Sequence, residues 1–425
     1  MRKIVKKQKT LNNEKNYFYA NMLLFLIWPF AVFINSINYF KYKSAKIFLI
    51  LFFGLYGYSF ILDDARNYDS ERYAESFVQM ALLPASNFFE IIKQFNSQDG
   101  SSIDIVVTLL SFIISRITNN AHILFAVYSI FFGIFNVLSI NILYNKYSNN
   151  PNINTRLFLL FFLIINPIFN INGIRFWLAT WIFFYGAYFV IIDKNYKYLT
   201  LTAFAFLVHF SYFSINILLI IYLLIGTNNI FYYSLLAVSY VLPNFLFNHI
   251  KTILSYFSLG IQKHVSLYAN PDQIKQNNLN IEGHRFELVY IDHFMYWFFV
   301  VVILFIVLNK KKIRFDINDK RLYSFIILLL SYVNFVSIIP SGGRFKTLFY
   351  LFALAYILII YTKYKYLKID NITLIGFFIF IIDFIIVFRM GSENLNVILF
   401  LPFTLISQIA EIKYSAFNLI FHWLH

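Results

Sequence analysis

The chain has 425 residues, of which 60% are hydrophobic and 13% are charged, whereas soluble domains average about 45–50% apolar and about 25% charged residues. The net charge of +15 comes mostly from lysines and arginines in short loops between apolar segments, which favours the charge distribution of a membrane protein over nucleic-acid binding. The absence of cysteine excludes disulfides, thiolate metal sites and cysteine nucleophiles.

Long charge-free runs follow one another along the chain. They occupy residues 15–41, 46–63, 116–146, 156–175, 175–193, 197–251, 292–310, 321–344, 346–363, 370–383 and 393–411. A helix needs roughly 17–25 apolar residues to cross the hydrocarbon core, and most runs fit one crossing each. We therefore predict an all-α, polytopic integral membrane protein with about 11–13 transmembrane helices, in which residues 1–425 form a single membrane domain.

Lysines and arginines in short loops predict the orientation of these helices. The most basic loop, residues 310–321, is assigned to the cytoplasm. The other basic loops on that side are residues 41–46, 146–156, 194–197 and 363–368. Two long loops, residues 63–102 and 251–286, then lie on the outer face of the membrane.

This orientation makes two demands on the chain. Residues 198–250 have to cross three times with about 17 residues each, the lower limit for a span, and one turn falls near His209. Short or broken helices that line a cavity satisfy this demand. Residues 102–115 have to form a re-entrant or interfacial helix, and their apolar side chains recur at helical spacing.

The basic tail, residues 1–16, conflicts with this orientation because the count of crossings places it outside. Two explanations are open. Either the tail violates the positive-inside rule, or the apolar segment of residues 16–40 is a hairpin that turns at Trp28-Pro29 and does not cross. The segment is too long for the apolar region of a cleavable signal peptide.

The first outer loop carries carboxylates, arginines and tyrosines in alternation beside the membrane. Its sequence runs Asp63-Asp64-Ala65-Arg66-Asn67-Tyr68-Asp69-Ser70-Glu71-Arg72-Tyr73-Ala74-Glu75-Ser76-Phe77. Carboxylates accept hydrogen bonds from sugar hydroxyls, and aromatic rings offer apolar faces to sugar rings. The pattern fits a sugar-binding site, and it also fits a solvated amphipathic loop.

Two arginines are placed on the outer side, where the positive-inside rule does not favour them. Arg175 begins an apolar helix, where free backbone amides and a guanidinium can bind an anion. An arginine there needs a partner, or it extends its side chain to the interface. Arg344 lies in a link with two glycines between two spans.

His209 interrupts a long apolar run, and ionisable residues at membrane depth usually face the bundle interior and have a function. The alternative is a hydrogen-bonded core histidine. Asp383 also lies within a span, where it can line a cavity or pair with an arginine. His264, His284 and His293 lack metal-ligand spacing, so we predict neither a metal nor a cofactor.

Three motifs, in this order, resemble those of the O-antigen and exopolysaccharide polymerase families. They are Asp69-Ser70-Glu71-Arg72-Tyr73 with Phe77, Asn172-Gly173-Ile174-Arg175-Phe176-Trp177-Leu178-Ala179, and His209-Phe210-Ser211. Order and spacing agree over residues 41–225, and beyond them the likeness lies in topology and in Arg344. The chain departs from these families in its basic N-terminal tail and in Phe176, where many relatives have glutamine.

This resemblance implies a polymerase of lipid-linked oligosaccharide repeat units at the outer face of the bacterial plasma (inner) membrane, with a fold like that of the C-type glycosyltransferases. The growing glycan on undecaprenyl diphosphate would be transferred to the incoming repeat without a metal ion. The implied partners are the lipid-linked oligosaccharide substrates, membrane lipids and a chain-length regulator protein, and no nucleic acid.

Such a transfer needs a base for the acceptor hydroxyl and positive charge for the diphosphate leaving group. Arg175 and Arg344 are the candidates for binding the diphosphate. His209 is the first candidate for the base, and Asp69 is the second. The residues expected to bind substrate are Arg66, Tyr68, Arg72, Tyr73, Asn172 and Ser211.

Two other functions remain open. A polysaccharide flippase or other transporter would also have about a dozen spans with charges inside the membrane. We would then expect inverted repeats with paired broken helices, and the sequence shows none. A glycan ligase would share the same cavity and differ in its acceptor, which the sequence does not reveal.

Overall fold

The computed structural model describes residues 2–62, 69–88, 90, 104–147, 153–242, 286–309, 315–337, 341–363, 370–409 and 414–421. Within these ranges the regular structure is helical, apart from one isolated antiparallel bridge between Asn396 and Ser415. The predicted all-α, polytopic membrane architecture is confirmed. Much of the two long outer loops, including residues 63–68, 91–103 and 251–285, lies outside the described ranges.

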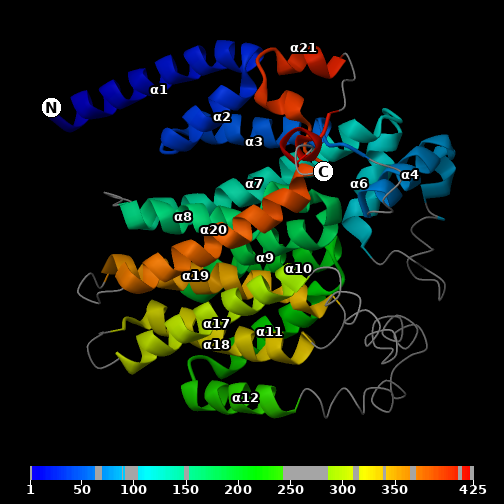
Figure 1. Cartoon of the computed structure of the whole chain (residues 1–425). Coiled ribbons are helices and arrows are strands. Elements are labelled where there is room, and N and C mark those ends of the chain that lie inside the picture. The colour runs from blue at the N-terminus through cyan, green and yellow to red at the C-terminus, as the bar shows by residue number, and fades with distance from the viewer. Residues whose placement is uncertain are drawn as a thin grey trace.

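The helices follow one another in this order (Figure 1): α1 (Arg2–Ile27), α2 (Pro29–Asn38), α3 (Lys43–Tyr58), α4 (Asp69–Leu82), η1 (Ala85–Asn87), α6 (Ile105–Ser115), α7 (Ala121–Tyr147), α8 (Ile153–Ile165), η2 (Ile168–Gly173), α9 (Ile174–Ile192), η3 (Tyr196–Tyr198), α10 (Leu199–Val208), α11 (Tyr212–Ile225), α12 (Asn229–Val241), α17 (Phe286–Leu308), α18 (Ile317–Val336), η4 (Gly342–Arg344), α19 (Phe345–Lys363), α20 (Asp370–Ser392), η5 (Val397–Phe400), α21 (Thr404–Ile409) and α22 (Ala416–Phe421).

Four of the described segments are long and apolar enough to cross a membrane by length and composition. They are Ala121–Asn145, Leu157–Ile192, Gly342–Lys363 and Ile375–Ser392. The second consists of two helices, α8 and α9, because Pro167 interrupts it before η2. Shorter apolar helices, among them α6, α10, α11 and α12, accompany these four. The number of about 11–13 crossings stays a prediction.

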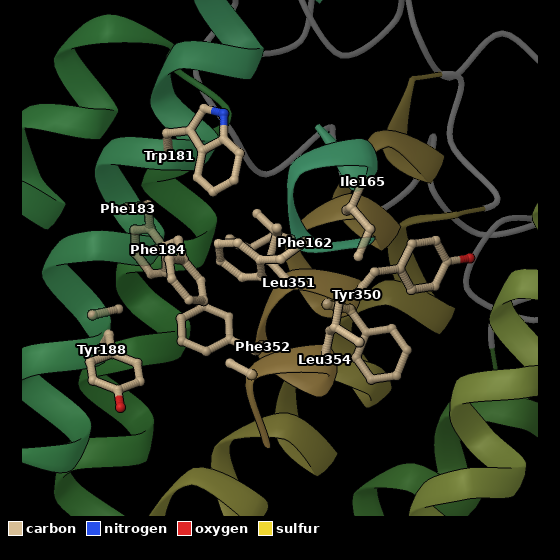
Figure 2. Packing of buried hydrophobic residues seen from close by; sticks show 14 of the residues in the cluster. Phe162, Ile165, Trp181, Phe183, Phe184, Tyr188, Tyr350, Leu351, Phe352 and Leu354 are labelled. Carbon is tan, nitrogen blue, oxygen red and sulfur yellow. The ribbon is translucent and has the colours of Figure 1, made fainter. Parts of the chain in front are cut away.

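Helices α9 and α19 form the centre of the bundle, and most of their side chains are buried. Figure 2 shows where they meet: the rings of Phe184 and Phe352 lie 4.8 Å apart, and Trp181 lies 5.4 Å from Phe162 of α8. Arg175 is the second residue of α9, and Arg344 directly precedes α19. The packed core therefore fixes the backbone of both arginines.

The N-terminal segment is a helical hairpin. Helix α1 ends at Ile27 and α2 begins at Pro29, whose ring lacks the N–H that would continue α1. The hydroxyls of Tyr17 and Ser36 lie 3.0 Å apart, so the two helices run back along each other from the turn. Of the two explanations for the basic tail, the structure therefore supports the hairpin.

The hairpin returns the tail to the side from which α3 begins. The Lys43 amide donates to the Glu14 carboxylate at 2.8 Å, which places the tail beside the basic loop of residues 41–46. In Figure 1 the N-terminus lies at the left, at the opposite end of the molecule from α4 and α6. The conflict between the tail and the predicted orientation therefore disappears.

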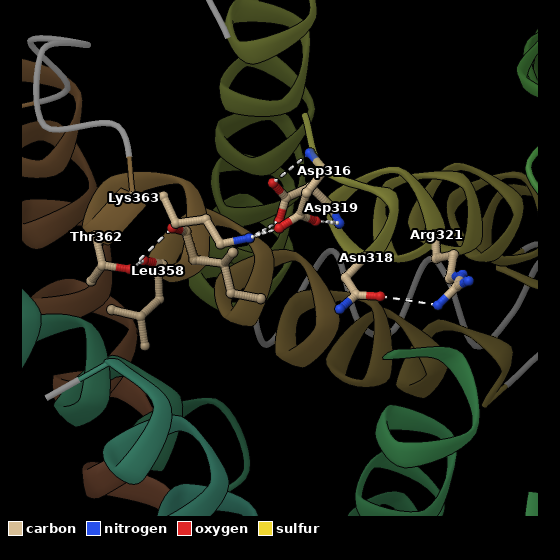
Figure 3. A network of polar contacts seen from close by, with 8 residues as sticks. Asp316, Asn318, Asp319, Arg321, Leu358, Thr362 and Lys363 are labelled. Carbon is tan, nitrogen blue, oxygen red and sulfur yellow. Dashed lines mark hydrogen bonds and ion pairs between the residues drawn. The ribbon is translucent and has the colours of Figure 1, made fainter. Parts of the chain in front are cut away.

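An ion-pair network joins other helices at the end that loop charge assigns to the cytoplasm (Figure 3). Lys363, the last residue of α19, lies 2.6 Å from both Asp316 and Asp319 at the start of α18. The same two aspartates form a capping box on α18. Arg321 donates to the Ile192 carbonyl at the end of α9 (3.4 Å). The ends of α9 and α19 and the start of α18 therefore meet.

The structure contains the short helices that the sequence predicts in two segments, while their paths relative to the membrane stay predictions. Residues 198–242 contain α10, α11 and α12, and the chain breaks between α10 and α11 at His209; residues 243–250 lie outside the described ranges. The Asn216 side chain donates to the Thr202 carbonyl at 2.9 Å, so α10 and α11 fold back on each other around that break. Helix α6 has 11 residues and is about 16 Å long, too short for a full crossing.

Candidate active site

Among the helices that begin at the end of the bundle opposite the basic loops, five have starts that lie beside one another. Their first residues are Asp69 (α4), Ile105 (α6), Ile174 (α9), Tyr212 (α11) and Phe345 (α19). The backbone N–H groups in the first turn of a helix have no partner within it and carry partial positive charge. Contacts join these five starts: Asn172 accepts from the Ser70 N–H, Asp104 accepts from the Phe210 N–H and pairs with Arg175, and Phe176 packs on Phe345.

Arg175 is held by two partners at the start of α9. Its Nη1 lies 3.0 Å from Asp104 Oδ2, and its Nε donates to the Tyr73 hydroxyl at 2.8 Å. The guanidinium also lies over the Tyr73 ring, 5.0 Å from its centroid. The Asp104 side chain is 7% exposed and that of Arg175 is 31% exposed. The arginine is therefore oriented by buried groups while part of it remains accessible.

Asp104 is a site residue that sequence reasoning missed. Its second carboxylate oxygen, Oδ1, accepts a hydrogen bond from the Phe210 N–H at 2.8 Å. Asp104 therefore ties the start of α9 to the turn of residues 209–211. A signal was available in the sequence: an arginine at the outer face needs an acidic partner, and Asp104 directly precedes the short apolar helix α6 at that face.

His209 lies in the three-residue break between α10 and α11, outside both helices. Its Nδ1 accepts a hydrogen bond from the Ser211 N–H at 3.2 Å and lies 3.1 Å from the Ser211 hydroxyl. Burial lowers the pKa of His209 to about 4; the charge of Asp104 opposes this shift and that of Arg175 reinforces it. The ring is therefore neutral at pH 7. Because Nδ1 is an acceptor, the proton is on Nε2.

Phe176 connects His209 to α19. The Phe176 ring lies 5.4 Å from the imidazole and 5.2 Å from the Phe345 ring, edge to face in both cases. At this position many polymerase relatives have glutamine, as noted above. Here an apolar ring, and not an amide, lies between the histidine and the start of α19, so no hydrogen bond of an amide side chain can orient the substrate at residue 176.

Residues 69–82 form helix α4 inside the segment that the sequence indicates as a loop. Asp69 and Glu71 in its first turn complement the positive end of the helix, and Phe77 is fully buried beneath it. The Asn172 side-chain oxygen accepts a hydrogen bond from the Ser70 N–H at 3.2 Å. Asn172 therefore holds the start of α4 beside the start of α9.

Asp69 faces the start of α9. Its carboxylate forms an ion pair with Arg72 on the same helix. Its Oδ2 would lie 3.9 Å from a Cβ added at Gly173, the residue before α9. The Asp69 side chain is 29% exposed, so a carboxylate oxygen is accessible close to Arg175.

Arg344 ends the short turn η4 directly before α19. Gly342 is required in this turn, because a Cβ there would lie 1.8 Å from the Val336 carbonyl oxygen. Arg344 directly precedes Phe345, whose ring packs on Phe176 beside His209, so Arg344 begins α19 next to the same site. Its side chain is exposed and has no ion-pair partner within the described ranges, so its charge is available to a ligand.

The structure brings together all the predicted site residues that it describes, namely Asp69, Arg72, Tyr73, Asn172, Arg175, His209, Ser211 and Arg344. Arg66 and Tyr68 lie outside the described residues. In the part of the chain that the structure describes, no three His, Asp or Glu side chains are grouped so that they could hold a metal ion.

The chain matches the model of a known protein family. The model of the EpsG family matches residues 65–405, which include all five helix starts and extend far beyond the motifs of residues 69–211. Helices α1, α2 and α3 precede the matched residues. No curated protein and no solved structure matches the chain.

Proposed function

Because the chain belongs to the EpsG family, whose members are linked to exopolysaccharide biosynthesis, we propose that it polymerises oligosaccharide repeat units carried on undecaprenyl diphosphate. The reaction takes place at the outer face of the bacterial plasma membrane without a metal ion. The growing glycan leaves its lipid carrier and joins the incoming lipid-linked repeat, so the protein is a membrane-embedded glycosyltransferase.

The proposed reaction forms one bond and breaks one. A hydroxyl oxygen of the incoming repeat attacks the anomeric carbon of the sugar at the reducing end of the growing glycan. The bond from that carbon to the diphosphate oxygen breaks, and its electron pair leaves with the lipid diphosphate. The hydroxyl proton passes to a base. A single displacement of this kind inverts the anomeric carbon.

The placement of two arginines at the neighbouring starts of α9 and α19 supports this proposal most. The leaving diphosphate gains negative charge as the bond breaks, and oriented N–H groups and guanidinium groups stabilise that charge without having to reorganise. Arg175 is oriented by Asp104 and Tyr73. Arg344 supplies a positive charge that no described residue neutralises.

In this proposal His209 donates a hydrogen bond and Asp69 is the base. The Ser211 N–H occupies His209 Nδ1, so the neutral ring presents an Nε2–H donor, which suits a diphosphate oxygen and not a proton-releasing hydroxyl. Asp69 has a partly exposed carboxylate beside Gly173, two residues before Arg175. The second candidate from the sequence therefore takes the role of the base.

Glycan analysis on cells tests the proposed function. Deletion of a polymerase leaves single repeats on the surface, and the wild-type protein restores long chains. Deletion of a flippase would leave no repeats at the surface, and deletion of a ligase would leave full-length glycan on its lipid carrier. Either of the last two results would replace the polymerase with the corresponding alternative.

A further inference from the structure

A second polar cluster lies on the other side of Phe345 from His209. Lys346, the second residue of α19, forms an ion pair with Asp292 of α17. The hydroxyl of Tyr350, one turn further along α19, lies 3.2 Å from both Asp292 Oδ1 and the Asp292 carbonyl oxygen. None of these three residues has a role in the transfer step proposed above.

The two clusters meet at the start of α19, where Arg344 and Lys346 are two residues apart. The Phe345 ring packs against Phe176, whose ring also contacts His209. Successive residues of a helix point about 100° apart. Phe345 therefore faces the site of Arg175 and His209, while Lys346 faces α17. Two ligands bound to the two clusters would be neighbours.

The second cluster has charges of both signs. Asp292 contributes a carboxylate, Lys346 an ammonium group and Tyr350 a phenol hydroxyl. Helix α20 packs beside them, because the Phe299 ring of α17 lies 6.0 Å from Phe380 of α20 and 5.0 Å from Tyr350. The Asp292 side chain is 41% exposed and that of Lys346 is 17% exposed. An anion would be repelled by the carboxylate and a cation by the ammonium group. A neutral ligand rich in hydroxyls fits, because each hydroxyl both donates and accepts hydrogen bonds.

The cluster lies next to a face of the bundle that is apolar and exposed. On α20 the neighbours of half-buried Asp383 are exposed, namely Ile381, Ile382, Phe384 and Ile385. In a polytopic membrane protein such a face contacts lipid. A saccharide whose carrier lipid stays in the bilayer can therefore reach the cluster from the side.

We propose that Asp292, Lys346 and Tyr350 bind the terminal sugar of the incoming lipid-linked repeat and hold its attacking hydroxyl beside the glycan bound at Arg175. This inference rests on the proposed function, because a transfer between two lipid-linked saccharides needs two adjacent sites. The Asp292 carboxylate accepts hydrogen bonds from sugar hydroxyls, and Lys346 and Tyr350 fix the position of that carboxylate.

The test uses the purified full-length protein in liposomes, with a long lipid-linked glycan as donor and a single lipid-linked repeat as acceptor. The KM of each substrate is measured while the other is saturating. We expect Asp292→Asn to raise the KM of the acceptor about 10- to 100-fold, and Tyr350→Phe about 3- to 10-fold, as charge-assisted and neutral hydrogen bonds are lost. The KM of the donor should stay within about twofold.

Tyr222→Phe is the matched control. Tyr222 also has a hydrogen-bonded hydroxyl, which donates to the Arg321 carbonyl at 3.0 Å, but it lies at the end of the bundle with the basic loops, so its variant should leave both KM values unchanged. If Asp292→Asn does not fold, the acceptor KM of Tyr350→Phe still tests the acceptor site. Equal changes in the KM of donor and acceptor, or an unchanged acceptor KM in the folded variants, would overturn the acceptor site. A wild-type protein that elongates nothing would instead refute the proposed function, and the acceptor site with it.

Discussion

Arg175 and Arg344 differ in what surrounds them, although both are proposed to bind the diphosphate. Arg175 already contacts Asp104 and Tyr73, whereas Arg344 is exposed. Lysine keeps the charge but not the planar pair of donors. We expect Arg175→Lys and Arg344→Lys to insert normally and to slow polymerisation about 10²–10³-fold, a loss of roughly 2–4 kcal/mol of transition-state stabilisation. Wild-type chain lengths in both variants would show that the diphosphate binds elsewhere.

Substitutions of His209 show whether this residue acts as a hydrogen-bond donor or as the base. Glutamine can accept the Ser211 N–H and still donate, so His209→Gln should retain activity within about tenfold of wild type, whereas His209→Ala should lose about 10²-fold or more. The folded pKa of about 4 lies below the ordinary value of 6.5. His209 therefore stays neutral above pH 5, and its contribution to stability is lost only as the pH falls from 6.5 towards 4. An inflection of the rate near pH 6.5 that disappears in His209→Gln would contradict this role.

Residue types could be predicted from the sequence, but their pairing could not. The motifs indicated Arg175, His209 and Asp69 because these residues are unusual beside apolar helices. Asp104 escaped notice because no motif includes it, and because its partners, Arg175 and the Phe210 N–H, are distant in sequence. The tautomer of His209 likewise depends on a backbone N–H whose direction only the fold determines.

At the scale of helices, Lys363 joins the end of α19 to the start of α18. The Asp319 side chain is 1% exposed and that of Lys363 is 33% exposed, so Lys363→Met removes the lysine from a buried carboxylate. We expect a loss of about 2–4 kcal/mol, below the upper range for fully buried pairs because water reaches the lysine. Thermal unfolding in detergent measures it. Lys320→Met, which removes an exposed lysine nearby, is the control. Equal melting temperatures for the two variants would show that the ion pair of Lys363 does not stabilise the bundle.

The same network predicts how stability depends on pH. Burial tends to raise the pKa of Asp316, but hydrogen bonds from Lys363 and from backbone amides outweigh it, and the pKa lies below its ordinary value. The stabilisation is therefore present above the ordinary pKa of 3.8 and is lost as the pH falls through the lowered value. Melting temperatures of wild type and Asp316→Asn should converge only below pH 4. A constant difference down to pH 3 would contradict this.

The break at His209 and the short helix α6 could be predicted from the sequence, whereas helix α4 could not. The break at His209 follows from the number of crossings and from the length of residues 198–250, and the short helix α6 follows from the same count. Helix α4 was missed because its many charges resemble a solvated loop. Its buried Phe77 and the bond from Asn172 to Ser70 come from tertiary packing, which overrides a local charge pattern.

The whole molecule has one end with basic loops and one end with the proposed site. Loop charge alone predicted this arrangement, because each long core helix has to carry the chain from one end to the other. The exception was the N-terminal tail, whose side depended on whether residues 16–40 cross. The length of this apolar segment could not decide whether it crosses, because one spanning helix and a hairpin of two short helices both need a long apolar stretch.

Accessibility of introduced cysteines tests this arrangement, and the chain offers no cysteine of its own. The hairpin and the bond from Lys43 to Glu14 place the tail at the end that loop charge assigns to the cytoplasm. Asn13→Cys and Lys320→Cys, both at exposed positions, should therefore resist a membrane-impermeant thiol reagent on intact spheroplasts and react after lysis. Ser86→Cys, exposed beyond α4, should react in both cases. Labelling of Asn13→Cys alone on intact spheroplasts would mean that α1 crosses the membrane. Labelling of Lys320→Cys on intact spheroplasts would show that the bundle has the opposite orientation. Arg175, Arg344 and His209 would then lie on the cytoplasmic face, where a polymerase of outward-facing glycans cannot work.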